Sequence, residues 1–319
     1  MVIPDANTRQ GGRTRTGNAE DGIALMTVLW VLLLLSTMAA TLVAIAQTEL
    51  GVVRNAVDNA RVASIADAGI YHAIFGVLDA RPNKELRTDG TASRLEFGGG
   101  ELWISIQDEA GKVDINRAQD TLFRGLFEQV GIDGPRAHEL VDRIADFRDQ
   151  DSLVRLRGAE KDDYAALGLP HGPRNEPFQA IEEIQQVLGL TPEIFQSIEP
   201  FITVHSRHRS IDPASAPELV LRAAPNLSTA GVDELLVERA EMTDGTQSPS
   251  SLTTAQQRAG SRGAGGVYTV RATAILENKA TFVREAIISL RRSTESPYRI
   301  LRWKQSFDRR QSDTGEFLN

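Results

Sequence analysis

The sequence of 319 residues contains no cysteine and has fewer basic than acidic side chains. The lack of cysteine excludes disulfide bonds, thiolate zinc sites and a cysteine nucleophile. There are 35 Lys and Arg against 43 Asp and Glu, and the net charge of −8 disfavours general binding to nucleic-acid phosphates. The patterns HExxH, GxSxG and the P-loop do not occur and the five histidines are scattered, so the sequence predicts no enzyme active site.

Apolar residues are concentrated near the N-terminus instead of being spread evenly. Residues 23–46 contain no charged side chain, and a helix of this length covers about 36 Å, enough to cross a membrane. A secretory signal peptide has a shorter apolar region and a small-residue cleavage site after it. Arg9, Arg13 and Arg15 precede the run and the next basic residue is Arg54. The sequence therefore predicts a single transmembrane helix with a cytoplasmic N-terminus.

The helical pattern continues beyond the apolar run. Apolar residues recur at steps of three or four, and no proline interrupts the chain between Ile23 and Arg81. We therefore expect one long helix whose second half packs on a globular head through a single apolar stripe: Leu50, Val53, Val57, Ala60, Ala63, Ala66, Ile70, Ile74 and Val77.

The residues around the start of this helix resemble a type IV prepilin signal. Gly22 ends the polar leader and directly precedes the apolar run, which implies cleavage by prepilin peptidase between Gly22 and Ile23. Such signals usually carry a glutamate at the fifth position after the cut, but Thr27 stands there in this sequence. Lack of that glutamate is a trait of one pseudopilin family, protein K of type II secretion.

Five further stretches resemble the same family and occur in the expected order. The chain is therefore identified as a member of the protein K family of type II secretion, the large minor pseudopilins. The stretches are ISIQDEAGKVDINRA (104–118), IADFRDQD (144–151), RGAEKDDY (157–164), PRNEPFQAIEEI (173–184) and SPYRILRWKQ (296–305).

This resemblance implies a non-enzymatic assembly subunit that requires no cofactor. It implies an inner-membrane protein with the bulk of the chain in the periplasm, at the tip of a pilus-like fibre, the pseudopilus, that exports folded proteins across the outer membrane. The implied partners are the other minor pseudopilins, the major pseudopilin and prepilin peptidase, and no nucleic acid. A membrane-anchored enzyme or helix-hairpin-helix binding module is the alternative.

Alternation of apolar residues predicts strands in two parts of the chain. Leu102, Ile104 and Ile106 alternate with their neighbours, and the alternation resumes at 113–115 after a turn-like segment 108–111, which together predict a β-hairpin within 94–116. Alternation over 268–274 and a β-rich run over 282–290 predict two more strands, joined by a turn at 277–280. These strands can form one antiparallel sheet that the long helix covers, a pilin-like arrangement.

Between the two groups of strands the pattern is helical, so the predicted fold class is α+β with a large inserted all-α domain. Gly131 and Gly189 are expected just past helix ends, Thr191 as a helix cap before Pro192, and Ser215 with Glu218 as a capping box. Residues 115–118 resemble 211–214 and suggest a faint repeat. The predicted divisions are a leader (1–22), a transmembrane helix (23–46), a pilin-like helix with the first strands (47–116), an inserted helical domain (117–240), a flexible loop (241–264), C-terminal strands (265–305) and a tail (306–319).

Two polar features of the helical part suggest binding. Gly131 to Gly134, between two helices, partly resembles a helix-hairpin-helix motif, but its acidic surroundings disfavour DNA. A run of acidic residues between 142 and 163 suits calcium, which takes six to eight oxygen ligands. The family resemblance also implies calcium, because calcium sites are known among proteins of this family. A solvated acidic face paired with arginines is the alternative. The candidate calcium ligands are Asp149, Asp151, Glu160, Asp162 and Asp163.

Overall fold

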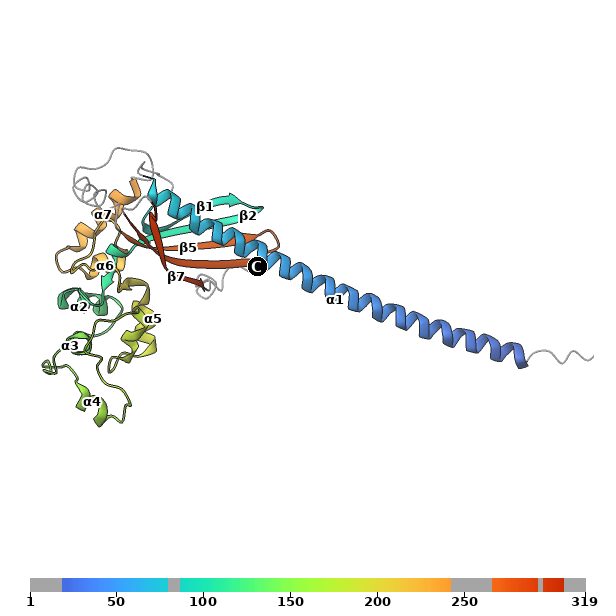
Figure 1. The fold of residues 1–319 in the computed structure, drawn as a ribbon, viewed down its shortest axis with the longest axis horizontal. Helices are drawn as coiled ribbons and strands as arrows, with labels where there is room; N and C mark the ends of the chain where they lie inside the picture. Colours follow the sequence, from blue (N-terminus) through green and yellow to red (C-terminus); the bar gives the residue numbers. More distant parts are fainter. Residues whose placement is uncertain (1–18, 80–86, 242–265, 292–294, 307–319) are drawn as a thin grey trace, which may run out of the picture. The chain divides into compact units, whose positions relative to one another are not determined.

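The computed structural model describes residues 19–79, 87–241, 266–291 and 295–306, with side chains from Ala24 onward. The predicted leader up to residue 18 and the predicted tail after residue 306 lie outside these ranges. So does the predicted loop (241–264) apart from Glu241, which is the last residue of a helix. The chain divides into two compact units, Met1–Asp58 and Asn59–Asn319. In the first unit the described residues form a single helix, the first part of α1 (Ala19–Leu78), so the predicted long helix is confirmed (Figure 1).

The second unit contains a five-stranded antiparallel sheet in the order β1-β2-β5-β6-β7 (Figure 1). Strands far apart in the sequence pair at the centre of the sheet, because β2 pairs with β5 from Gly100↔Leu276 to Asp108↔Tyr268. The predicted single sheet and the predicted turn at 277–280 are therefore confirmed. The strands are β1 (Asp89–Phe97), β2 (Gly100–Asp108), β5 (Val267–Leu276), β6 (Thr281–Leu290) and β7 (Tyr298–Ser306).

The second half of α1 covers one face of this sheet, as predicted. Ala66, Ile70 and Ile74 of the predicted stripe are buried, but Leu50, Val53 and Val57 are exposed in the single chain. The rest of the contact consists of neighbouring residues, Val62, Ile65 and Ala73 among them. At Gly69 the helix comes so close to the sheet that an added Cβ would lie 2.9 Å from Ala272 Cβ.

The prediction that residues 102–106 and 113–115 form a hairpin within 94–116 is wrong, because the first of these segments pairs with a different strand. β2 pairs with β1, and the turn between them is Gly98–Gly99, both with positive φ (66° and 77°), as a tight two-residue turn requires. The segment expected as the turn forms a short 3₁₀ helix, η1 (Glu109–Gly111), with Asp108 as its cap. β3 (Val113–Asp114) then pairs in parallel with β4 (Ile202–Thr203), away from the main sheet.

The region between β2 and β5 is helical and has its own core, as predicted. Leu122, Phe123, Leu126 and Phe127 of α2 are buried there, together with Tyr164 of α4. The segment 181–186 forms a 3₁₀ helix where an α-helix was expected. The helices are α2 (Asp120–Gln129), α3 (Gly134–Arg148), α4 (Lys161–Ala166), η2 (Ile181–Gln186), α5 (Pro192–Ile198), η3 (Glu199–Phe201), α6 (Glu218–Ala223) and α7 (Thr229–Glu241).

Most of the predicted helix boundaries in this region are confirmed. Gly131 and Gly189 have φ of 87° and 83°, the left-handed conformation expected past a helix end. Thr191 caps α5 by accepting a hydrogen bond from the Ile194 N–H, and Pro192 is the first helical residue. The predicted capping box of Ser215 is wrong, because α6 begins only after Pro217 and the Ser215 hydroxyl makes no hydrogen bond within the described residues.

Candidate functional site

The first part of α1 has the properties of a membrane span by length and composition. Among the described residues, one helix is long and apolar enough to cross a membrane, and no residue of its apolar window is buried in the single chain. Thr27, where the prepilin pattern has glutamate, donates its hydroxyl to the Ala24 carbonyl at 2.8 Å. Thr37, Thr41 and Thr48 bond to carbonyls one turn back in the same way. Their hydroxyls are therefore satisfied without water, as a lipid environment demands.

The structure describes only part of the predicted cleavage site. Gly22 and Ile23 lie in the first turns of α1, but the side chain of Ile23 and all of residues 1–18 are outside the described part. The cut after Gly22 therefore stays a prediction.

The second part of α1 carries two aromatic side chains that stay largely exposed. Tyr71 and Phe75 lie one turn apart and are 51% and 69% exposed. The helix is fixed beneath them, because Asp67 forms an ion pair of 2.6 Å with Arg284 of β6 and Tyr71 lies 6.0 Å from the Trp303 ring of β7. A rigid helix with a partly exposed aromatic face suits contact with another helix. Sequence periodicity identified the buried stripe but not this exposed aromatic pair.

Acidic residues at the end of α3 and in the chain after it form a cluster, with Asp146 at its centre. Asp146 is fully buried, and its Oδ2 accepts hydrogen bonds from the N–H groups of Arg155 (3.2 Å) and Ala159 (3.0 Å). Burial raises the pKa values of Asp146, Asp149 and Glu160, and repulsion among neighbouring carboxylates adds to the effect for all three. One oxygen of each of these three side chains is buried without a hydrogen-bond donor.

The predicted calcium ligands are distributed unevenly over this cluster. Asp149 and Glu160 belong to it, and the charge of Asp151 acts on both. Asp162 is exposed, and Asp163 accepts a hydrogen bond from the Glu160 N–H at the start of α4 (2.8 Å). Across the described ranges, no three Asp, Glu or His side chains stand in positions that would hold a metal ion. The residue that sequence reasoning left out is Asp146, which the spacing placed on the same helix face as Asp149.

The segment that resembled a helix-hairpin-helix motif uses its backbone groups internally. The N–H groups of Gly131 and Ile132 donate to carbonyls of α2 at 3.0 and 2.9 Å. Asp133 caps α3 by accepting from the Arg136 N–H at 2.8 Å. Few N–H groups of this turn are left to bind a phosphate, so the geometry favours a structural hairpin.

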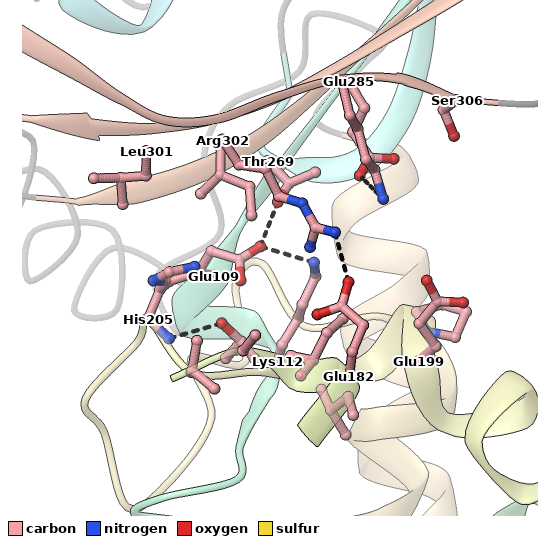
Figure 2. Close-up of a pocket in the computed structure, with 18 of the residues that line it drawn as sticks. Glu109, Lys112, Glu182, Glu199, His205, Thr269, Glu285, Leu301, Arg302 and Ser306 are labelled. Atoms are coloured by element: carbon pink, nitrogen blue, oxygen red, sulfur yellow. Dashed lines mark hydrogen bonds and ion pairs between the residues drawn. The ribbon is translucent and has the colours of Figure 1, made fainter. Parts of the chain in front are cut away.

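A polar cleft lies between the helical region and the sheet face opposite α1 (Figure 2). It has a volume of about 380 Å³ and is lined by η1, η2 and β4 on one side and by β5, β6 and β7 on the other. Two contacts bridge it: Arg302 of β7 pairs with Glu182 of η2 at 2.5 Å, and Thr269 of β5 donates to Glu109 of η1 at 2.7 Å (Figure 2).

Glu109 is the most buried charged group of this cleft. It is 2% exposed and pairs with Lys112 at 2.7 Å. Burial alone would raise the pKa of Glu109, but Lys112 and the hydroxyls of Thr203 and Thr269 outweigh it and hold the pKa below its usual value. His205 lies half-buried nearby, and burial lowers its pKa. Sequence analysis missed the pair of Glu109 and Lys112 because the segment 108–111 was assigned to a turn. The one available signal was the i,i+3 spacing of these opposite charges.

Comparison with family models supports the sequence resemblance. The model of the family "Type II secretion system (T2SS), protein K" matches residues 104–207, which hold η1, α2 to α5 and β4. A solved structure of the GspK-GspI-GspJ complex from the type 2 secretion system of enterotoxigenic Escherichia coli contains a chain with 15% identity and a TM-score of 0.48, covering 82% of this chain and 99% of that one.

Curated relatives with similar sequences carry the same description. The type II secretion system protein K of Klebsiella pneumoniae is 24% identical over 245 residues, covering 69% of this chain and 75% of that protein. The protein K of Pectobacterium carotovorum subsp. carotovorum is 27% identical over 124 residues, and the putative protein K of Escherichia coli K12 is 32% identical over 83 residues. These two matches span 38% and 25% of the relatives' lengths, well under two thirds of either.

Proposed function

We propose that this chain, which belongs to the type II secretion system protein K family, is a minor pseudopilin: a non-enzymatic subunit that is anchored in the inner membrane and assembles with other pilin-like subunits. The observation that carries this proposal is the dual use of α1. Its first part is a charge-free apolar helix, and its second part covers a five-stranded antiparallel sheet. A simple membrane anchor needs only the first part, whereas a subunit of a helical bundle needs both.

Partner binding follows from the exposed surfaces of the same helix. The aromatic face at Tyr71 and Phe75 is available for helix contacts within the head. We infer that the partners are two smaller minor pseudopilins, with the major pseudopilin below them. Because Thr27 replaces the usual glutamate, no carboxylate is present there to pair with the N-terminal amine of a subunit above, and a tip position needs none. At the tip of the periplasmic pseudopilus the chain would act in the export of folded proteins.

Processing by prepilin peptidase is the first test of the proposal. Co-expression with the peptidase is expected to shorten the full-length chain by the 22 residues of the leader, leaving Ile23 as the N-terminus. Gly22→Ala is expected to block most of the cleavage, because a side chain hinders the approach of the peptidase to the backbone. Gly17→Ala, the same change elsewhere in the leader, is the matched control and should be cut normally. Intact mass spectrometry of the membrane fraction measures the mass of the wild-type chain and of both variants. An uncut wild-type chain would refute the proposal.

We further propose that calcium binds the acidic cluster, with Asp146 as an added ligand and without Asp162 and Asp163, which the sequence had suggested but which are exposed. The donor chemistry fits a hard cation, because buried carboxylate oxygens of Asp146, Asp149 and Glu160 lack hydrogen-bond donors and repel one another. These side chains do not stand in ligating positions in this structure, so they would have to turn toward one another around the ion. Asp151 would complete the set from the loop surface. Arg155 lies 3.7 Å from Asp146 and neutralises only part of the cluster; when bound, the ion would add positive charge, and the carboxylates would then hold the chain after α3 in place.

The calcium proposal is tested by the melting temperature of the chain with and without a chelator. At a calcium concentration one hundred times Kd, binding stabilises the folded state by about 2.7 kcal/mol, which raises the melting temperature by about 5–10 °C in a domain of this size. Asp149→Asn should abolish the increase, whereas Asp162→Asn, at an exposed position, should keep it. An unchanged melting temperature on chelation would exclude calcium.

A further inference from the structure

The loop between α3 and α4 turns apolar side chains toward solvent. Leu153, Val154 and Leu156 are 78%, 56% and 91% exposed, and Leu167, directly after α4, is 64% exposed. Residues 153–156 are called the leucine loop below. Surface loops normally place polar side chains outside, so a group of large apolar residues at one site indicates contact with another molecule.

The backbone of the leucine loop is held in place by acidic side chains beneath it. Asp146 accepts hydrogen bonds from the N–H groups of Arg155 and Ala159, and Asp142 accepts one from the Arg157 N–H at 3.3 Å. Gly158 fits so tightly that an added Cβ would lie 1.7 Å from Asp146 Oδ2. The outward direction of the leucines is therefore built into the fold, and binding would cost little ordering of the loop.

A basic hollow adjoins the leucine loop. Arg136, Arg143 and Arg157 line it, and this set is called the arginine hollow below. Arg136 donates to the Gly189 carbonyl at 2.7 Å and Arg143 to the Leu188 carbonyl at 3.0 Å. An added Cβ on Gly189 would lie 2.5 and 2.7 Å from these two guanidinium groups, so they lie side by side above the same glycine.

The charges of the arginine hollow are only partly neutralised. Arg136 and Arg143 share one carboxylate, Glu139, and the other acidic residue of the lining, Asp133, caps α3. Arg157 is exposed, and its side chain forms no ion pair with the part of the chain that the structure describes. Three guanidinium groups thus face two carboxylates, on a chain whose net charge is −8. Guanidinium groups fixed in this way favour planar carboxylates as ligands.

We propose that the leucine loop and the arginine hollow form one docking surface for a protein segment that carries both acidic and apolar side chains. The apolar residues of the segment would cover the leucines, and its carboxylates would pair with the arginines. An anionic lipid surface fits less well, because a broad surface would also meet the exposed carboxylates of Asp151, before the leucine loop, and of Asp162 and Asp163 on α4. A single protein segment can place its carboxylates on the arginine hollow alone. This surface is separate from α1, so the proposal does not depend on the pseudopilin assignment.

Site-specific photo-crosslinking in the native cells tests this proposal on the full-length chain. Benzoylphenylalanine in place of Leu156 should capture a protein, and the mapped crosslink should lie beside Asp or Glu residues of that protein. The same group in place of Ala165, exposed on α4, is the matched control and should capture little. Arg157→Glu should lower the yield at position 156 about tenfold, equivalent to about 1.4 kcal/mol, whereas Arg157→Lys should keep most of it.

Charge reversal then separates specific docking from mere apolar adhesion. Lysine in place of the mapped acidic residues of the captured protein should restore crosslinking to Arg157→Glu. Leu153→Ser, which changes no charge, should also lower the yield while the melting temperature stays the same. The proposal is overturned if position 156 captures no more than position 165, if the captured species is phospholipid, if the mapped segment lacks acidic residues, or if Arg157→Glu leaves the yield unchanged.

Discussion

Removal of the Glu109 carboxylate is expected to weaken the junction between the helical region and the sheet. Glu109 pairs with Lys112 at 2.7 Å and accepts a hydrogen bond from Thr269 at 2.7 Å, and the side chains of the ion pair are only 3% and 12% exposed. Glu109→Ala leaves the Lys112 ammonium buried without its partner. Breaking a buried pair from one side costs about 3–5 kcal/mol, a large share of the roughly 5–15 kcal/mol that stabilises a typical domain.

A double-mutant cycle isolates the energy of this pair. Glu109→Ala, Lys112→Ala and the double variant are unfolded with urea in detergent micelles, and tryptophan fluorescence reports the transition. Because Glu109→Ala leaves a buried charge and the double variant does not, the double variant should be less destabilised than the two single variants together, with a coupling of about 2–3 kcal/mol. A coupling under about 0.5 kcal/mol, as found for exposed pairs, would refute the assignment of this pair as a buried tie.

The pH dependence provides an independent check with a definite sign. Lys112 and the neighbouring hydroxyls hold the pKa of Glu109 below its usual value in spite of burial. The folded state therefore favours the ionised form, so the carboxylate contributes its full stability above the unfolded-state pKa of about 4.3. This contribution is lost as the pH falls through the lower folded-state pKa. The difference in unfolding free energy between wild type and Glu109→Gln should be constant above about pH 5.5 and shrink below about pH 4.3.

Three other substitutions test separate parts of the molecule. Gly125→Ala places a Cβ 2.1 Å from a carbonyl oxygen of α6, so it should destabilise the chain by about 1–3 kcal/mol in the same urea assay. Phe75→Ser should reduce co-purification of the small pilin-like partners several-fold, whereas Phe97→Ser, a similarly exposed phenylalanine at the β1–β2 turn, should not. Gly158→Ala should release the loop after α3 and speed its amide hydrogen exchange, whereas Gly172→Ala, where the added Cβ meets only ordinary contacts, should leave the exchange unchanged.

The main elements of the second unit follow from periodicity, but the exact face of α1 does not. The alternation over 268–274 predicted β5 because every second side chain of that strand is buried. In α1, Val62 and Ala63 belong to two neighbouring rows of apolar residues, and periodicity alone cannot tell which row faces the sheet. The sheet decides: Val62 is fully buried, whereas Ala63 is only partly covered.

Alternation also does not identify the partner of a strand. Val113 and Ile115 are both buried, so the pattern was read correctly, but they belong to the core of the helical region. The faint repeat shows a similar limit. Asp114 and Asp212 make the same set of local hydrogen bonds. In each, the side-chain carboxylate accepts from the N–H two residues later, and the backbone carbonyl accepts from the N–H groups three and four residues later. The structural repeat therefore aligns these two aspartates, two residues away from the alignment that the sequence suggested.

The position of the helical region in the sheet explains how so large an insertion is compatible with a pilin-like sheet. The chain leaves the sheet after Asp108 and returns at Val267, and Asp108 pairs directly with Tyr268 in the hydrogen-bonded neighbours β2 and β5. Both connections therefore lie at the same end of two adjacent strands, and the insertion interrupts no strand pairing. Because the sheet and α1 share one core and the helices share another, the helical region can change in size or surface without repacking α1. What must be kept is the junction, where Glu109 and Arg302 bridge the two cores, so substitutions there should disturb the relation of the two parts while each core stays intact.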